Sequence, residues 1–134
     1  MTDALVKVFL VGVGGGLGSI SRFGLSEIAQ QLLGPGSAQR YPLGTLMANV
    51  LGCLLAGFLA FFLIDRSVLT PQHRLLLMTG FLGGLTTFSS FGYETVVLSK
   101  SGDWGIAGLN IVANVVLSLA AVWVGWTAAR AIWG

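Results

Sequence analysis

Four long apolar segments, separated by short polar stretches, make up nearly the whole chain. They cover residues 4–31, 43–64, 71–99 and 104–133. A helix needs about 20 predominantly apolar residues to cross a bilayer, and every segment is long enough. The pattern therefore predicts an all-α membrane protein with four transmembrane helices in one domain, residues 1–134. It leaves no room for a soluble domain.

The composition supports this prediction and excludes several other classes of protein. Hydrophobic residues make up 54% of the chain and charged residues 9%, whereas a soluble domain carries about 25% charged residues. Cys53 is the only cysteine, which excludes an intrachain disulfide and a cysteine metal cluster. The first apolar run is too long for a signal-peptide core. The net charge of +2 is ordinary for a membrane protein, so we expect no nucleic-acid partner.

The third segment is interrupted by glycines and hydroxyl residues where a lipid-facing helix should be uniformly apolar. The interruption comprises Gly80, Gly83, Gly84, Thr86, Thr87, Phe88, Ser89, Ser90, Phe91 and Gly92. It predicts a helix broken near the membrane midplane, and such breaks mark ion and substrate sites. A continuous glycine-rich helix, with its hydroxyls bonded to their own turn, is the alternative.

Small residues recur every four positions on the first two segments. The first segment holds the pairs Gly12/Gly16 and Gly14/Gly18. The second holds Gly44, Ala48, Gly52, Ala56 and Ala60. Such rows let helices approach closely.

Polar residues form two rows at helical spacing on otherwise apolar segments. Thr45, Asn49 and Cys53 follow one another on the second segment. Asn110, Asn114 and Ser118 do the same on the fourth. An amide in a bilayer is costly unless it is hydrogen-bonded, so Asn49 either joins helices or donates to a permeating species. We favour the second interpretation because Thr45 shares its row, and we predict a polar track.

The charged residues bear on membrane orientation. Lys7, Arg66, Arg74 and Arg130 fall on one side of a four-span chain, and Arg40 and Lys100 fall on the other, with Arg22 near it. Orientation follows the difference in Lys and Arg between short loops. So small a difference suggests insertion in both orientations, which would permit an antiparallel homodimer. Thr70 before Pro71 predicts a helix N-terminus.

The residue types favour transport of an anion over catalysis or proton-coupled transport. The sequence has no catalytic triad, no zinc motif and no phosphate-binding loop. No acidic residue lies at the centre of a span, where a proton-coupled exporter needs one. The remaining central groups are hydroxyls, amides and phenyl rings, and the ring edge carries positive potential.

Three stretches carry a resemblance to a known family. Residues 15–22, residues 44–52 and residues 80–91 with Glu94 are similar to the motifs of the CrcB/Fluc family of fluoride channels. The resemblance covers essentially the whole chain. The third stretch is the most specific of the three.

The resemblance implies an antiparallel dual-topology homodimer in the cell (inner) membrane. It implies passive, chloride-excluding fluoride export through two pores. It also implies a central structural sodium ion, held by the main-chain carbonyls of Gly83 and Thr86. Pore residues would be Asn49, Phe88, Phe91, Thr45, Thr87, Ser89, Ser90, Asn114 and Ser118, with Arg22 and Glu94 in the vestibule. Asn114 stands where serine is common, a change that could alter conductance.

Two other functions remain open from the residues alone. A small dual-topology multidrug exporter also has four short helices, but it needs a membrane-embedded glutamate, and Glu27 and Glu94 lie near the span ends. A scaffold subunit that transports nothing is the third possibility. It predicts unchanged transport after both Phe88 and Phe91 are replaced.

Overall fold

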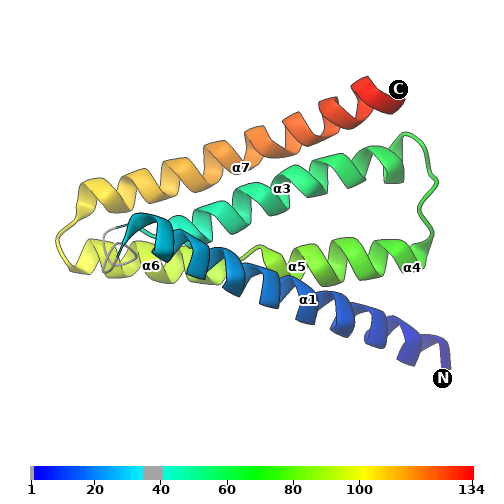
Figure 1. Cartoon of the computed structure of the whole chain (residues 1–134), viewed down its shortest axis with the longest axis horizontal. Coiled ribbons are helices and arrows are strands. Elements are labelled where there is room, and N and C mark those ends of the chain that lie inside the picture. The colour runs from blue at the N-terminus through cyan, green and yellow to red at the C-terminus, as the bar shows by residue number, and fades with distance from the viewer. Residues whose placement is uncertain (1, 35–40) are drawn as a thin grey trace.

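The computed structural model describes residues 2–34 and 41–134, and all the regular structure in this part of the chain is helical (Figure 1). The helices are α1 (Thr2–Leu33), α3 (Leu43–Ile64), α4 (Pro71–Arg74), η1 (Leu75–Leu82), α5 (Gly83–Leu85), α6 (Phe88–Lys100) and α7 (Trp104–Trp133). Four helical stretches are long and apolar enough to cross a membrane, namely Asp3–Leu32, Leu43–Ile64, Pro71–Lys100 and Trp104–Trp133. The prediction of an all-helical, multi-pass membrane protein is confirmed. Arg40, used in the charge comparison, lies outside the described residues.

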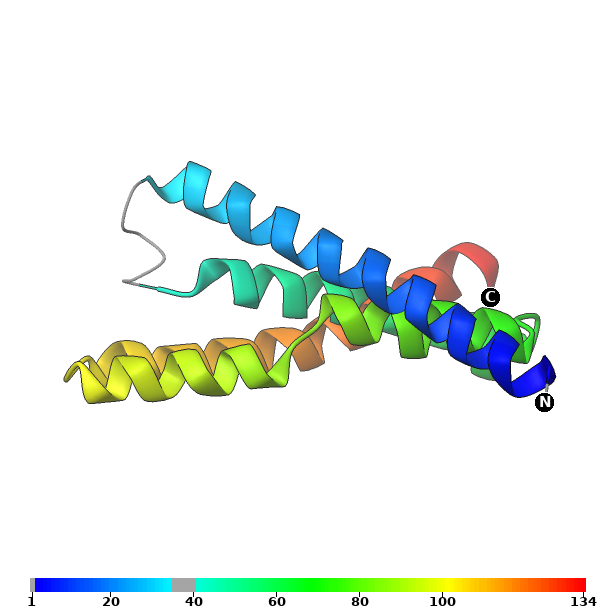
Figure 2. The ribbon, with the colours of Figure 1, turned by 90° about the horizontal axis from the view of Figure 1, so that it is seen from below.

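The third span changes neighbours halfway along its length. Its first half, η1 and α5, packs against α1, whereas its second half, α6, packs against α7. Figure 2 shows the chain bending between α5 and α6 to make this change. The remaining long helix, α3, lies along α7. The two termini and the α3–α4 connection share one end of the molecule (Figure 1).

Local hydrogen bonds explain where the third span starts, stops and restarts. The Thr70 hydroxyl accepts from the backbone N–H of His73, and Pro71 follows, so the predicted N-terminus is confirmed. The π-helical η1 then leads into α5, which ends at Leu85. Thr86 (φ −82°, ψ 155°) and Thr87 (φ −151°, ψ 120°) are extended. Helix α6 begins at Phe88, and the Thr87 hydroxyl accepts from the Ser90 N–H as its cap.

Glycines permit two close helix approaches. A Cβ at Gly14 would collide with the carbonyl oxygen of Leu76, and one at Gly18 would collide with that of Phe81, so this pair lets α1 lie directly on η1. A Cβ at Gly12 or Gly16 would meet no atom of residues 2–34 or 41–134 within 4 Å. The α3–α7 contact depends on a different pair, Gly57 against Val122 and Gly125 against Leu54. The four-residue rows in the sequence did not single out this second pair.

Candidate functional site

A cavity of about 350 Å³ lies beside the interruption of the third span. It is lined by Asn49, Cys53, Thr86, Thr87, Phe88, Phe91, Asn114, Val115, Ser118 and Leu119. Seven of these come from the residues that the sequence analysis assigned to the pore or the sodium site. The tertiary structure therefore brings most of the candidate residues from α3, α6, α7 and the interruption to one place.

Asn49 is the centre of the hydrogen bonding at this cavity. Its Oδ1 accepts from the backbone N–H of Thr87 at 2.8 Å. Its Nδ2 donates to the Thr87 carbonyl at 3.2 Å and to Asn114 Oδ1 at 2.9 Å. One side chain thus holds both backbone groups of an extended residue and joins α3 to α7.

These bonds occupy both hydrogens of the Asn49 amide. An asparagine side chain has two N–H donors, and both already have acceptors, on Thr87 and Asn114. Asn49 therefore joins elements of the bundle, which was the first of the two interpretations offered for it. It can donate to a permeating ion only by giving up one of these acceptors.

The rings of Phe88 and Phe91 form a pair at the edge of the cavity. Their centroids lie 5.3 Å apart and their planes are inclined at 59°. Phe91 is buried, with 9% of its surface exposed, whereas Phe88 is 82% exposed. Helix α6 thus places one ring inside the chain and leaves the other on its surface.

Hydroxyl groups gather around Thr87. The Thr87 Oγ1 donates to Ser90 Oγ at 3.1 Å and lies 3.2 Å from Ser89 Oγ. Ser90 Oγ accepts in this bond, so its own hydrogen remains available. Ser118 lines the cavity from α7, and its hydroxyl has no hydrogen-bond partner among the described residues. The free donors at this site are therefore hydroxyls and not amides.

Thr45 and Glu94 bond to each other, away from the cavity lining. The Thr45 hydroxyl donates to Glu94 Oε1 at 2.6 Å. The other carboxylate oxygen, Oε2, is buried and has no hydrogen-bond partner in the described part of the chain. Arg22 lies partly buried on α1 and does not line the cavity. These three residues are thus separate from the group around Asn49.

The carbonyls of Gly83 and Thr86 lose their usual helical donors at the interruption. In an α-helix the carbonyl of Gly83 would accept from the Thr87 N–H and that of Thr86 from the Ser90 N–H. The Thr87 N–H donates to Asn49 and the Ser90 N–H to the Thr87 hydroxyl. Both oxygens are therefore released from the helical ladder. Within the described residues, no group of three or more His, Cys, Asp or Glu side chains could hold a metal.

Some lining residues were missed by sequence reasoning. Cys53 was visible as the third member of the Thr45–Asn49 row, but it was not assigned to the pore. Val115 and Leu119 carry no polar signal that could have revealed them. Asn110 was placed on the polar row of α7 and was not assigned to the pore, but it bonds directly to Asn114.

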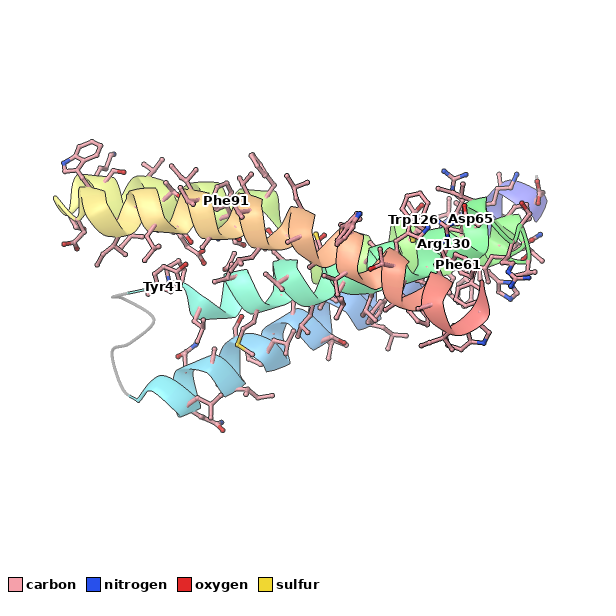
Figure 3. All side chains as sticks on the ribbon, turned by 90° about the horizontal axis from the view of Figure 1, so that it is seen from above. Tyr41, Phe61, Asp65, Phe91, Trp126 and Arg130 are labelled. Carbon is pink, nitrogen blue, oxygen red and sulfur yellow. The ribbon has the colours of Figure 1, made fainter. Side chains whose placement is uncertain are left out.

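Other polar contacts lie at the ends of the bundle, as Figure 3 shows. Phe61, Asp65, Trp126 and Arg130 gather at the end that holds the termini, and Trp126 Nε1 donates to Asp65 Oδ2 at 3.1 Å. Tyr41 lies at the opposite end, before α3, and burial raises the pKa of its hydroxyl. Neither group contacts the cavity beside Asn49.

Comparison with known proteins identifies the family. The family described as CrcB-like protein, Camphor Resistance (CrcB), matches residues 9–126. A fluoride-specific ion channel FluC from Opitutus terrae is 45% identical over 121 residues, covering 89% of each chain. A protein of the same name from Methylobacillus flagellatus is 42% identical, over 91% of this chain and 93% of the relative. Another from Nitratidesulfovibrio vulgaris is 40% identical, over 94% of this chain and 98% of the relative. These relatives are transporters and not enzymes, and the resemblance noted in the sequence is confirmed. The chain belongs to the CrcB family.

Proposed function

We propose that this protein is a fluoride-selective channel of the cell (inner) membrane through which fluoride leaves the cell passively. Two chains in opposite orientations would form a homodimer with two pores and a structural sodium ion at its centre. The names of the curated relatives support the choice of ion. The geometry beside Asn49 supports the position of the pore.

The observation that carries the proposal is the chemistry of the cavity lining. It combines amides, hydroxyls, two phenyl rings, a thiol and two aliphatic side chains, and among the described residues no acidic or basic side chain lines it. Fluoride is small, so it needs close hydrogen-bond donors to replace its water, and pore width and donor placement give selectivity. The hydroxyl of Ser118, which lines the cavity, has a hydrogen free to donate, and ring edges add positive potential. The amide of Asn49 contributes when the ion replaces one of its present acceptors.

The exposed side of the cavity supports a dimeric pore. Phe88, Val115 and Leu119 line the cavity and are also exposed on the surface of the chain. A single chain therefore does not close the cavity. A second chain would complete the wall, and the free faces of Gly12 and Gly16 are smooth enough for close helix contact.

The released carbonyls at the interruption fit a sodium site. Unwound backbone carbonyls at broken membrane helices are the usual ligands for sodium. Each chain would offer the oxygens of Gly83 and Thr86, and two chains related by a twofold axis would offer four. When bound, the ion supplies a fixed positive charge between the pores. Replacing sodium by an organic cation in the buffer should lower the melting temperature of the dimer.

One feature suits the alternative of a proton-coupled multidrug exporter. Glu94 is half-buried within the bundle and one of its oxygens is unpartnered among the described residues, as a proton-carrying carboxyl would be. Its other oxygen is engaged by Thr45. The exporter predicts proton-driven uptake of a lipophilic cation that is lost in Glu94→Gln.

The experiment that tests the channel is fluoride efflux from liposomes carrying the purified protein, read with a fluoride electrode. We expect rapid fluoride release without chloride release, and strong loss in Phe88→Leu and Phe91→Leu. Wild-type rates in a variant with both rings replaced would show that the rings take no part in permeation. No fluoride release from well-folded wild-type protein would refute the channel, and this is the result that a scaffold subunit predicts.

A further inference from the structure

A continuous chain of hydrogen bonds runs behind the cavity from α6 through α7 to α3. Asn110 Nδ2 donates to Thr95 Oγ1 at 2.9 Å. Asn114 Nδ2 donates to Asn110 Oδ1 at 2.9 Å and to the Asn110 carbonyl at 3.0 Å. Asn49 Nδ2 then donates to Asn114 Oδ1 at 2.9 Å. Asn110 is completely buried, at 0% exposure, yet it is not part of the cavity lining.

Backbone groups at the two ends of this series of hydrogen bonds determine which way each asparagine amide in it points. At one end, Thr95 Oγ1 donates its only hydrogen to the carbonyl of Phe91, so it must accept from Asn110. Asn110 then turns its oxygen toward Asn114, and Asn114 turns its oxygen toward Asn49. At the other end, the Thr87 N–H can only donate, so Asn49 turns its oxygen to Thr87 and its nitrogen to Asn114. The two ends therefore require the same orientation of the three side-chain amides.

In this orientation, the carbonyl oxygen of Asn114 occupies a donor that an anion would need. The amide hydrogens of Asn49 point at Asn114 Oδ1 and at the Thr87 carbonyl. An anion at Asn49 must therefore displace an acceptor. The Thr87 carbonyl belongs to the backbone, whereas the Asn114 side chain can rotate, so Asn114 is the acceptor that can leave.

We propose that Asn110 is a positioning residue that holds the Asn114 oxygen on the amide of Asn49, where it competes with the permeating anion. The inference rests on the proposed function and adds a control of anion affinity to it. Asn110 acts here only through Asn114. Loss of its side chain would release one Asn114 N–H and leave the second bonded to the backbone carbonyl of residue 110.

The test is the fluoride dependence of current through the full-length protein in planar bilayers. In Asn110→Leu, of similar volume, the half-saturating fluoride concentration should fall about fivefold, the factor equivalent to one typical hydrogen bond. In an Asn114→Ser background, Asn110→Leu should leave the half-saturating fluoride concentration unchanged, because the competing amide oxygen of Asn114 is already absent. Ser99→Ala, which removes a hydroxyl bonded to its own helix at 2.9 Å, is the matched control and should leave the concentration unchanged.

Other results would overturn the inference. An unchanged or raised half-saturating concentration in Asn110→Leu, or an equal fall in the Asn114→Ser background, would assign Asn110 to helix packing alone. Wild-type protein without fluoride current would instead refute the proposed function itself.

A spectroscopic measurement on the wild-type protein decides the question if Asn110→Leu does not fold. In asparagine-labelled protein, fluoride titration should move the side-chain amide proton resonances of Asn49, which binds the ion, and those of Asn114, whose side chain rotates away from it. Movement at only one of the two residues, or at neither, would contradict the inference.

Discussion

At the scale of single residues, Asn49 holds the extended backbone of Thr87 through both its oxygen and its nitrogen. In Asn49→Leu the Thr87 N–H and the Asn114 oxygen lose their partner, and each buried unsatisfied group costs about 1–3 kcal/mol. We expect a lower melting temperature and loss of fluoride efflux, measured on the same preparation by thermal unfolding and by the fluoride electrode.

Asn49→Asp is the informative contrast to this substitution. It retains an oxygen for the Thr87 N–H but removes both donors and adds negative charge. We expect it to keep more of the wild-type stability than Asn49→Leu and still to pass no fluoride. Wild-type efflux in either variant would show that the amide plays no part in permeation.

At the scale of helices, the contact between α3 and α7 depends on Gly57 and Gly125, where a Cβ would strike the opposite backbone. Because backbone cannot yield as a flexible side chain can, Gly57→Ala must push the helices apart. Overpacking of this kind costs about 1–3 kcal/mol. We expect a clear fall in the melting temperature in detergent.

Gly108→Ala on α7 is the matched control for this prediction. A Cβ at Gly108 would meet no atom within 4 Å in the part of the chain that the structure describes, and alanine has the higher helix propensity. Its melting temperature should be unchanged or slightly raised. If Gly57→Ala and Gly108→Ala lower the melting temperature equally, the α3 and α7 backbones are not in close contact at Gly57.

At the scale of the whole molecule, the near balance of positive charge between the two ends predicts insertion in both orientations. By sequence, Lys7, Arg66, Arg74 and Arg130 fall on one side of the four spans, and Arg40 and Lys100 fall on the other, with Arg22 near it. Adding arginines to one end should give every chain a single orientation. Such chains could not form an antiparallel dimer and should not protect cells against fluoride.

Two oppositely biased variants test this prediction together. Ser101→Arg with Asp103→Arg adds charge at the α6–α7 connection, and Ser67→Arg with Gln72→Arg adds it at the α3–α4 connection and the first turn of α4. Reporter fusions to the C-terminus should show one orientation for each. Fluoride resistance should return only when both are co-expressed. Full resistance from either variant alone would contradict the antiparallel arrangement.

The helices and their ends could be predicted from the sequence because each signal is local. Apolar length marks the spans, and Thr70 before Pro71 marks the start of the third. The candidate cavity was partly predictable, since Asn49, Asn114 and Ser118 stand out as polar residues on apolar helices. Cys53, Val115 and Leu119 could not be assigned with them, because the cavity wall depends on which faces of α3, α6 and α7 meet.

The amino-acid sequence by itself determined the four membrane spans, the neutral chemistry of their polar residues and the family. Hydrophobicity, hydrogen-bonding capacity and local motifs belong to residues wherever the chain places them. Only the tertiary structure decided that Asn49 donates its amide hydrogens to Thr87 and Asn114, and that Glu94 accepts a hydrogen bond from Thr45. These partners are far apart in the sequence, and packing in three dimensions alone brings a donor within reach of its acceptor.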